Sequence, residues 1–266
     1  MTNPGIKQQL VELAPWHMDI RLPDGSSTID GNQKNFDDPN FQEVSVVKTL
    51  EMRQQISQLY PGGLQGKSLL DVGCNAGAYC IMAHELGADF AYGFDVREHW
   101  INQARFVART WEIPETRVEF QTHHLHELGE KRKFDITIFK GVFYHLPDPI
   151  HALKTLSDVT NETIIVDTGT RNDIPEDCLI AKLESTTHVM SGVDQLSWYP
   201  GGPGALTKIL NWCGFAHCAT GRWVHNKKSI EKRPSKKKLN NIGRLRVVAS
   251  RNKEVIERFE EQRKAA

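Results

Sequence analysis

The sequence predicts an α/β fold with a mainly parallel sheet, on the basis of two apolar segments and the alternation that follows them. Residues 69–80 read Leu-Leu-Asp-Val-Gly-Cys-Asn-Ala-Gly-Ala-Tyr-Cys, which indicates a strand over Ser68–Val72, then a tight turn and a helix. A second apolar strand, Phe90–Phe94, ends in Asp95. From residue 66, strands and helices alternate, which is typical of a doubly wound sheet. Seven strands are expected, the last two as a hairpin: 68–72, 90–94, 118–122, 134–139, 163–167, 215–224 and 245–249.

The glycine spacing of the first turn indicates which kind of nucleotide it serves. A dinucleotide-binding turn reads Gly-x-Gly-x-x-Gly and faces a pyrophosphate. Here Asp71 precedes Gly73 and Gly77, and a carboxylate there would repel a pyrophosphate but suits the ammonium of a methionine moiety. The alternative is a turn whose glycines only reverse the chain. Asp95 stands where such folds place a ribose-hydroxyl acceptor, which favours ligand binding.

This arrangement resembles motif I of the class I S-adenosylmethionine-dependent methyltransferases, which have a Rossmann-like, seven-stranded sheet. The resemblance implies S-adenosyl-L-methionine as the cofactor. It also implies a cofactor site at the first turn and the end of the second strand, made by Asp71, Gly73, Asn75, Gly77 and Asp95.

Three histidines follow the third expected strand. In many proteins of this fold an Asp near this point binds the adenine amino group, and His124 stands about there instead. Leu125 and His126 are expected to flank the adenine. His123, His124 and His126 also allow a metal-site interpretation, but no nearby Cys or Asp completes a ligand set of usual spacing, so no metal is expected.

The segment after the fourth expected strand holds the candidate catalytic residues. It reads Lys-Gly-Val-Phe-Tyr-His-Leu-Pro from residue 140, and ligands of such sheets bind beyond the carboxyl ends of the strands. Lys140, Tyr144 and His145 are therefore expected near the reaction centre. The alternatives are a solvated lysine, a packed tyrosine and a histidine that fixes the loop through a backbone carbonyl.

A narrower resemblance rests on Gly-Val-Phe-Tyr-His at 141–145, Asn-Trp-Cys-Gly-Phe at 211–215 and Gly-Arg-Leu-Arg-Val-Val-Ala at 243–249. These motifs are similar to those of the tRNA wobble-uridine (carboxy)methyltransferase-like family, over roughly residues 40–250. In the carboxymethyl-transferring member, the matching Tyr144 and Arg244 would help to hold the extra carboxylate of the cofactor. That member also uses a lysine in its N-terminal Trp-containing segment, and Pro15–Ile20 has none, which favours plain methyl transfer.

The chain is expected to have three parts. Residues 1–60 form an N-terminal extension, irregular up to residue 40 with a turn at Pro23–Gly25, followed by a helix over 41–60. Residues 61–251 form the methyltransferase domain, and residues 252–266 a charged C-terminal helix or tail.

Composition is that of a cytoplasmic enzyme. Of 266 residues, 39% are hydrophobic and 25% charged, and the formal net charge is zero, so no global field attracts nucleic acid or membrane. No apolar run approaches the roughly 20 residues that span a bilayer, and the first 13 residues lack the apolar core of a signal peptide. Five cysteines without a Cys-x-x-Cys pair indicate free thiols in a reducing compartment.

Two further segments bear on the acceptor, and three functions remain open. Residues 168–204 form a long insert with Trp198 and Tyr199, and residues 227–246 are strongly basic, which fits either a phosphate backbone or a solvated loop. The first hypothesis is methyl transfer to a small-molecule acceptor, with an oxygen nucleophile as one option. The second is a tRNA-modifying enzyme. The third is a cofactor-binding partner subunit without catalysis, which the complete set of cofactor residues disfavours.

Overall fold

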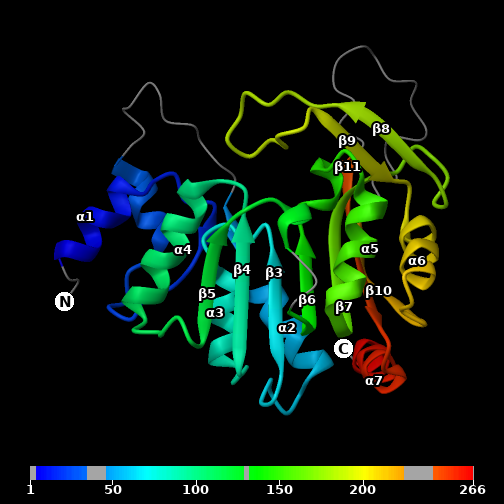
Figure 1. Ribbon diagram of the computed structural model, residues 1–266, viewed down its shortest axis with the longest axis horizontal. Coiled ribbons are helices and arrows are strands. Elements are labelled where there is room, and N and C mark those ends of the chain that lie inside the picture. Colours follow the sequence, from blue (N-terminus) through cyan, green and yellow to red (C-terminus); the bar gives the residue numbers. More distant parts are fainter. Residues whose placement is uncertain (1–3, 35–45, 129–131, 225–241, 266) are drawn as a thin grey trace. The chain divides into compact units, whose positions relative to one another are not determined.

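The computed structural model of the protein describes residues 4–34, 46–128, 132–224 and 242–265. The chain divides into two compact units, Met1–Leu128 and Gly129–Ala266. Seven strands belong to one sheet, in the order β10-β11-β7-β6-β3-β4-β5 (Figure 1). The predicted seven-stranded α/β fold is therefore confirmed. The predicted division at residues 60 and 251 stays a prediction.

The N-terminal unit contributes three parallel strands to this sheet, in the order β3-β4-β5. Helices α3 and α4 pack against these strands. Its elements are α1 (Pro4–Glu12), β1 (Met18–Asp19), η1 (Thr28–Lys34), β2 (Val47–Lys48), α2 (Leu50–Leu59), β3 (Ser68–Val72), α3 (Ala78–Glu85), β4 (Phe90–Asp95), α4 (Glu98–Thr110), β5 (Val118–Thr122) and η2 (Leu125–Glu127).

The C-terminal unit contributes the strands β10-β11-β7-β6, of which only the β6–β7 pair is parallel among the pairs described within this unit. Its elements are β6 (Phe134–Lys140), η3 (Phe143–His145), α5 (Pro149–Val159), β7 (Thr160–Arg171), β8 (Leu179–Leu183), β9 (Leu196–Pro200), α6 (Pro203–Trp212), β10 (His217–Val224), β11 (Ile242–Ser250) and α7 (Lys253–Ala265).

The central strands form where the sequence has short continuous apolar runs. All residues of β3 after Ser68 are buried, including the charged Asp71, because a parallel strand is covered on both faces. The same holds for Ile164, Ile165 and Val166 in β7. The predicted strands are confirmed, although β7 and β11 extend several residues beyond their predicted ends and β10 begins at His217.

The expectation of an irregular N-terminus is wrong for residues 4–12, which form α1. This short helix has little local signal and is held by tertiary contacts: Leu10 and Trp16 are buried, and Trp16 Nε1 donates to the Leu10 carbonyl (2.7 Å). The predicted turn is confirmed, since Gly25 has φ +85° and donates its N–H to the Leu22 carbonyl (3.0 Å).

The helix predicted over 41–60 begins only at Leu50. Val47 instead pairs with Met18 in the two-stranded β1–β2 ladder, and its N–H donates to the His17 carbonyl (2.8 Å). Val47 was expected within the helix. Its pairing with Met18, which is distant in the sequence, places it in a strand instead. Residues 41–45 lie outside the described part of the chain.

The insert after β7 is ordered as a β-hairpin, β8–β9, which Figure 1 shows in yellow and olive. Its register pairs Ile180 with Tyr199 and Ala181 with Trp198. The predicted long loop therefore contains two paired strands, and Trp198 and Tyr199 lie on β9.

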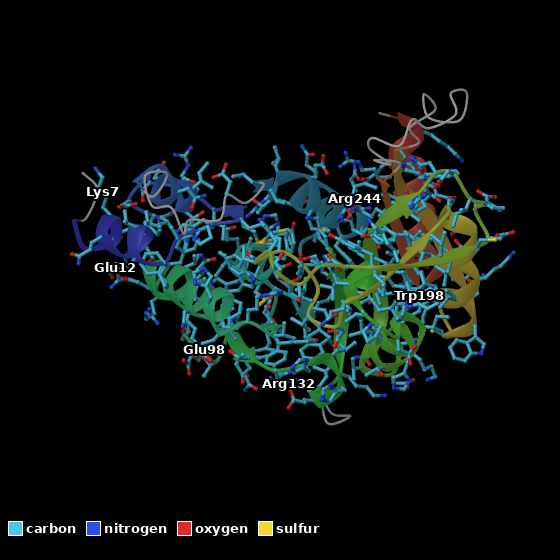
Figure 2. All side chains as sticks on the ribbon, turned by 90° about the horizontal axis from the view of Figure 1, so that it is seen from above. Lys7, Glu12, Glu98, Arg132, Trp198 and Arg244 are labelled. Atoms are coloured by element: carbon cyan, nitrogen blue, oxygen red, sulfur yellow. The ribbon has the colours of Figure 1, made fainter. Side chains whose placement is uncertain are left out.

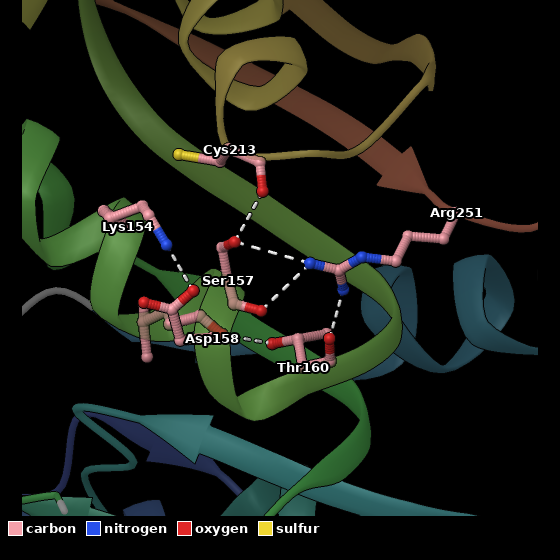
Figure 3. Close-up of polar contacts among 7 residues, drawn as sticks. Lys154, Ser157, Asp158, Thr160, Cys213 and Arg251 are labelled. Carbon is pink, nitrogen blue, oxygen red and sulfur yellow. Dashed lines mark hydrogen bonds and ion pairs between the residues drawn. The ribbon is translucent and has the colours of Figure 1, made fainter. Parts of the chain in front are cut away.

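Arg251, directly after β11, joins the ends of several elements of the C-terminal unit (Figure 3). Its guanidinium donates to the backbone carbonyls of Ser157 and Thr160, while Ser157 Oγ donates to the Cys213 carbonyl (2.6 Å). The guanidinium also lies 4.2 Å above the Phe215 ring. A cation at the last turn of α5 stabilises the negative end of the helix dipole, so Arg251 anchors β11 to α5.

In the described part of the chain, no helix combines the length and apolar character needed to cross a membrane.

Candidate functional site

The turn between β3 and α3 adopts a strongly curved backbone. Gly73 (φ +66°), Asn75 (φ +50°) and Gly77 (φ +76°) are all left-handed, a conformation that glycine and asparagine tolerate best. A Cβ at Gly77 would lie 2.5 Å from Cζ of Phe120, so this position excludes any larger residue. The sequence thus specifies a turn whose backbone packs closely against Phe120 of β5.

Asp95 is tied to this turn. Its Oδ2 accepts the Asn75 N–H (3.2 Å) and its Oδ1 accepts the Arg97 N–H (3.1 Å). The residue is 7% exposed. Burial raises the pKa of Asp95, and the hydrogen bonds from Arg97 and Asn75 oppose this shift only in part. Each carboxylate oxygen has a second acceptor position, which is the chemistry that a pair of ribose hydroxyls requires. The residues therefore fit the predicted nucleoside cofactor.

Asp71 is a buried carboxylate one strand residue before this turn. Its charge adds to burial in raising the pKa of Cys74 and of Cys80 well above the usual thiol value. Both thiols are consequently protonated and poor nucleophiles. Cys74 serves the packing of the turn, because a Cβ at Gly93 would meet its side chain at 2.9 Å.

The exit of β5 gives His123 a place beside Asp95 that the sequence analysis did not assign to it. The His123 N–H donates to the Asp95 carbonyl (3.2 Å), and its ring stacks on Phe94 with a centroid separation of 4.3 Å. Its Nε2 lies 2.7 Å from the Tyr92 hydroxyl. Of the expected adenine neighbours, Leu125 is half-buried, as His123 is, and His126 is exposed. The sequence contained a signal for this position, because His123 directly follows Thr122, the β5 residue that pairs with Asp95.

His124 takes a structural role at the start of η2. Its N–H donates to Glu127 Oε2 (2.6 Å), a hydrogen bond that lowers the pKa of Glu127, and its ring stacks on His126 with centroids 5.3 Å apart. His124 therefore caps the start of η2, which explains its position.

The candidate catalytic residues belong to the C-terminal unit. Lys140 ends β6 and pairs in register with Asp167 of β7, and Gly141, with φ +80°, turns the chain into η3. Tyr144 and His145 lie in η3, with ring centroids 4.0 Å apart. The structure thus places all three within one strand end and the turn that follows it.

Asp167 is the centre of a buried charge cluster. Arg244 Nε donates to its Oδ1 (2.9 Å) and Arg246 Nε to its Oδ2 (2.7 Å). The side chains of Asp167 and Arg246 are 3% and 6% exposed. Burial would raise the pKa of Asp167, but Arg244, Arg246 and Lys140 outweigh it, and the net pKa is lowered. Asp167 is therefore ionised, and it pairs with both arginines.

Arg244 links this cluster to Tyr144. Its guanidinium is hydrogen-bonded to the tyrosine and lies 5.8 Å from the ring centroid. Arg244 remains one-third exposed (34%), so it retains access to solvent (Figure 2). The pair named by the family resemblance, Tyr144 and Arg244, is thus in direct contact. The rest of the basic segment, residues 227–241, lies outside the described residues.

The β8–β9 hairpin contacts the turn that carries Tyr144. Tyr199 stacks on Tyr144, with centroids 5.6 Å apart and ring planes 27° apart. Trp198 Nε1 donates to the Pro147 carbonyl (3.0 Å), and Nδ1 of His145 lies 2.8 Å from Oε2 of Glu184. Glu184 was missed because nothing in the local sequence connects it to a histidine 39 residues earlier.

A family model described as a methyltransferase domain matches residues 64–211 of this chain. The chain belongs to the methyltransferase domain family. The N-terminal domain of EvdMO1, solved in the presence of SAH and D-fucose, superposes on this methyltransferase with a TM-score of 0.68 and 17% identity, over 94% of this chain and 97% of that one. The class I methyltransferase fold predicted from motif I is therefore confirmed.

Two curated relatives represent different acceptor classes. The tRNA U34 carboxymethyltransferase of Campylobacter hominis is 30% identical over 152 residues, which cover 56% of this chain and 50% of that protein. The ubiquinone biosynthesis O-methyltransferase of Acinetobacter baylyi is 30% identical over 124 residues, 46% of this chain and 51% of that protein. The matched region spans about half the length of these relatives. The match to a tRNA U34 carboxymethyltransferase agrees with the resemblance to the wobble-uridine enzymes that the sequence motifs indicated.

Proposed function

We propose that this methyltransferase transfers the methyl group of S-adenosylmethionine to an oxygen atom of a small-molecule acceptor. The cofactor would be held by the turn and strand ends of the N-terminal unit, namely Asp71, Gly73, Asn75, Gly77, Asp95, Leu125 and His126. When bound, the cofactor supplies a methyl group on a sulfonium that is already activated, so the protein has to align the acceptor and exclude water.

The observation that carries the proposal is the surroundings of His145. Its imidazole lies beside Tyr144, which is stacked on Tyr199, and beside the carboxylate of Glu184. A hydroxyl acceptor must lose its proton during transfer, and histidine is the side chain best suited to accept one near neutral pH. Stacked tyrosines suit a small ring-shaped acceptor, which supports a sugar or phenol.

Tyr144, His145 and Lys140 are the proposed acceptor-side residues. Burial raises the pKa of Tyr144, although Arg244 opposes it, so the hydroxyl stays protonated and donates hydrogen bonds at neutral pH. Lys140 contributes positive charge beside Asp167. In this assignment Tyr144 orients the acceptor and His145 receives its proton.

The test is a methyl-transfer assay with cofactor labelled in the methyl group. The acceptors are monosaccharides including D-fucose, simple phenols, a fractionated small-metabolite extract and bulk tRNA. We expect label in a small-molecule fraction, lost on changing His145 to Asn. Label that enters only tRNA would refute the small-molecule acceptor.

The second candidate is modification of a tRNA wobble uridine by methyl or carboxymethyl transfer. The matches to tRNA U34 carboxymethyltransferases favour it, as does the basic composition of residues 227–246. Two of those basic residues, Arg244 and Arg246, are bound to Asp167 and so contribute less to an RNA surface. The described structure therefore weakens one part of the case for RNA.

Replacing Lys236, Lys237 and Lys238 by Gln tests this candidate. Each lost phosphate contact lowers the slope of log affinity against log salt by about 0.9 for duplex and about 0.7 for single strands. We expect unchanged turnover of a small molecule. A salt-dependent tRNA affinity that disappears in the triple variant would establish the RNA alternative.

A further inference from the structure

We propose that Glu184 is a positioning residue, which orients His145 so that its Nε2 accepts the proton of a hydroxyl acceptor. This inference rests on the proposed function and adds to it a residue from the β8–β9 insert. It assigns the insert a part in the chemistry in addition to its part in packing.

The carboxylate of Glu184 is held by three donors. Nδ1 of His145 lies 2.8 Å from Oε2, Ser197 Oγ donates to the same oxygen (2.7 Å), and the Gly192 N–H also donates to the carboxylate. The side chains of His145 and Glu184 are only 17% and 19% exposed. Three donors converging on one largely buried acceptor fix both its position and its charge state.

The direction of the hydrogen bond follows from the ionisation of Glu184. Burial raises its pKa, but the hydrogen bonds from His145 and Ser197 outweigh burial and the net pKa is lowered. Glu184 is therefore a carboxylate at neutral pH and only accepts, so Nδ1 of His145 carries the hydrogen. In the neutral imidazole the basic nitrogen is then Nε2.

The hairpin is built closely around this pair. A Cβ at Gly192 would lie 2.9 Å from the His145 carbonyl oxygen and 3.0 Å from Glu184 Oε2. The backbone of the hairpin loop thus approaches to a distance that only glycine allows. Trp198, bound to the Pro147 carbonyl, fixes the same hairpin to the other side of the turn.

The neighbouring phenols do not compete with His145 as the base. Burial raises the pKa of Tyr144 and of Tyr199, and the charge of Glu184 adds to both shifts, so neither phenol competes as a base. Asp167 is neutralised by two arginines. Charged and titratable groups of η3 and of the elements packed around it include Tyr144 (η3), Asp148 (at the start of α5), Asp167 (β7), Glu184 (after β8), Tyr199 (β9) and Arg244 (β11).

The proposed step conserves atoms and charge. The acceptor hydroxyl gives its proton to Nε2 of His145 while its oxygen forms a bond to the methyl carbon. The carbon–sulfur bond breaks, and its electron pair stays on sulfur. The positive charge that appears on the imidazole is stabilised by Glu184 across the Nδ1 hydrogen bond, and the proton later passes to water.

The pH dependence of turnover with an acceptor from the panel tests this role. Wild-type kcat is expected to rise with pH as His145 loses its proton. Glu184→Gln keeps the shape but removes the charge, so the rising limb moves to lower pH by about one unit and the plateau falls about tenfold. Asp194→Asn, which removes an exposed charge from the same hairpin loop, is the matched control and should change neither. His145→Asn should lose about 10² to 10⁴-fold in kcat.

A purely structural role would lower kcat in Glu184→Gln without moving the limb, and that result would overturn the proposal. Nitrogen-15 NMR of the histidine rings in the full chain gives an answer that needs no acceptor. We expect the Nδ1–H tautomer for neutral His145 and a lower His145 pKa in Glu184→Gln but not in Asp194→Asn. An Nε2–H tautomer or an unchanged pKa refutes the positioning role. Absence of methylated product with these NMR results intact refutes the proposed function instead.

Discussion

The carboxylate of Asp95 offers the sharpest test of the proposed cofactor site. Changing it to Asn keeps its size in a site that is 7% exposed, but removes the charge at both oxygens. A hydrogen bond to a charged group contributes about 1.5–3 kcal/mol. Since each 1.4 kcal/mol is tenfold in affinity, the dissociation constant for S-adenosylmethionine should rise about 10- to 150-fold.

The assay is titration calorimetry on the folded variant, with Asp89→Asn as the matched control. Asp89 precedes the opposite end of the same strand, where its Oδ1 accepts the Gly66 N–H (3.3 Å), and it is exposed. Its loss should leave cofactor affinity unchanged. Unaltered affinity in a folded Asp95→Asn protein would refute the assignment of Asp95.

The pH dependence carries a further signature of the same residue. Because burial raises the pKa of Asp95, its contribution to the free energy of unfolding is present below the unfolded pKa of about 3.9 and is lost as pH rises through the folded value. Binding of hydroxyl donors needs the ionised form, so cofactor affinity should fall on acidification, at a higher pH than for an ordinary aspartate. Asp95→Asn should remove this fall.

Three other outcomes follow from the structure. Asp167→Asn leaves Arg246 buried without its counter-charge and should lower the free energy of unfolding by about 3–5 kcal/mol in urea denaturation. Because the net pKa of Asp167 is lowered, the stabilisation from its charge is present above about pH 3.9 and is lost as pH falls through the folded pKa. Gly77→Ala puts a Cβ at φ +76° and 2.5 Å from Phe120, so it should cost about 1–3 kcal/mol and weaken cofactor binding, with Gly62→Ala, which meets no atom within 4 Å, as the control. Competition binding of plain and carboxylated S-adenosylmethionine should show no preference for the carboxylated form, and a clear preference would favour the tRNA alternative.

Local patterns in the sequence were sufficient to predict the central fold. The apolar run of β3, the left-handed positions at Gly73 and Gly77, and the acid that ends β4 are all defined by residues close together in the chain. The helix over 41–60 and the irregular N-terminus were predicted less well, because Val47 pairs with Met18 and Trp16 is held by Leu10 and by the Asn32 side chain.

The acceptor side of the candidate site depends on contacts that no local pattern encodes. Arg246 and Asp167 are 79 residues apart, and His145 and Glu184 are 39 apart. The sequence indicated that Tyr144 and His145 matter, from their position after a buried strand. Which carboxylate each cation or imidazole meets depends on the register of β11 against β7 and on the β8–β9 hairpin.

The position of β11 has a consequence for how the protein is made on the ribosome. One edge of β7 pairs along its length with β11, from Arg171 with Ile242 to Thr163 with Ser250. Ser250 is synthesised 79 residues after Arg171 (250 − 171), which at about 5–20 residues per second takes about 4–16 s. During that interval the nascent chain carries the apolar strand Ile164–Val166 with an unpaired edge, the kind of surface that chaperones bind and other chains pair with. Slower translation between these two strands would therefore lengthen the time in which the chain is open to misassembly.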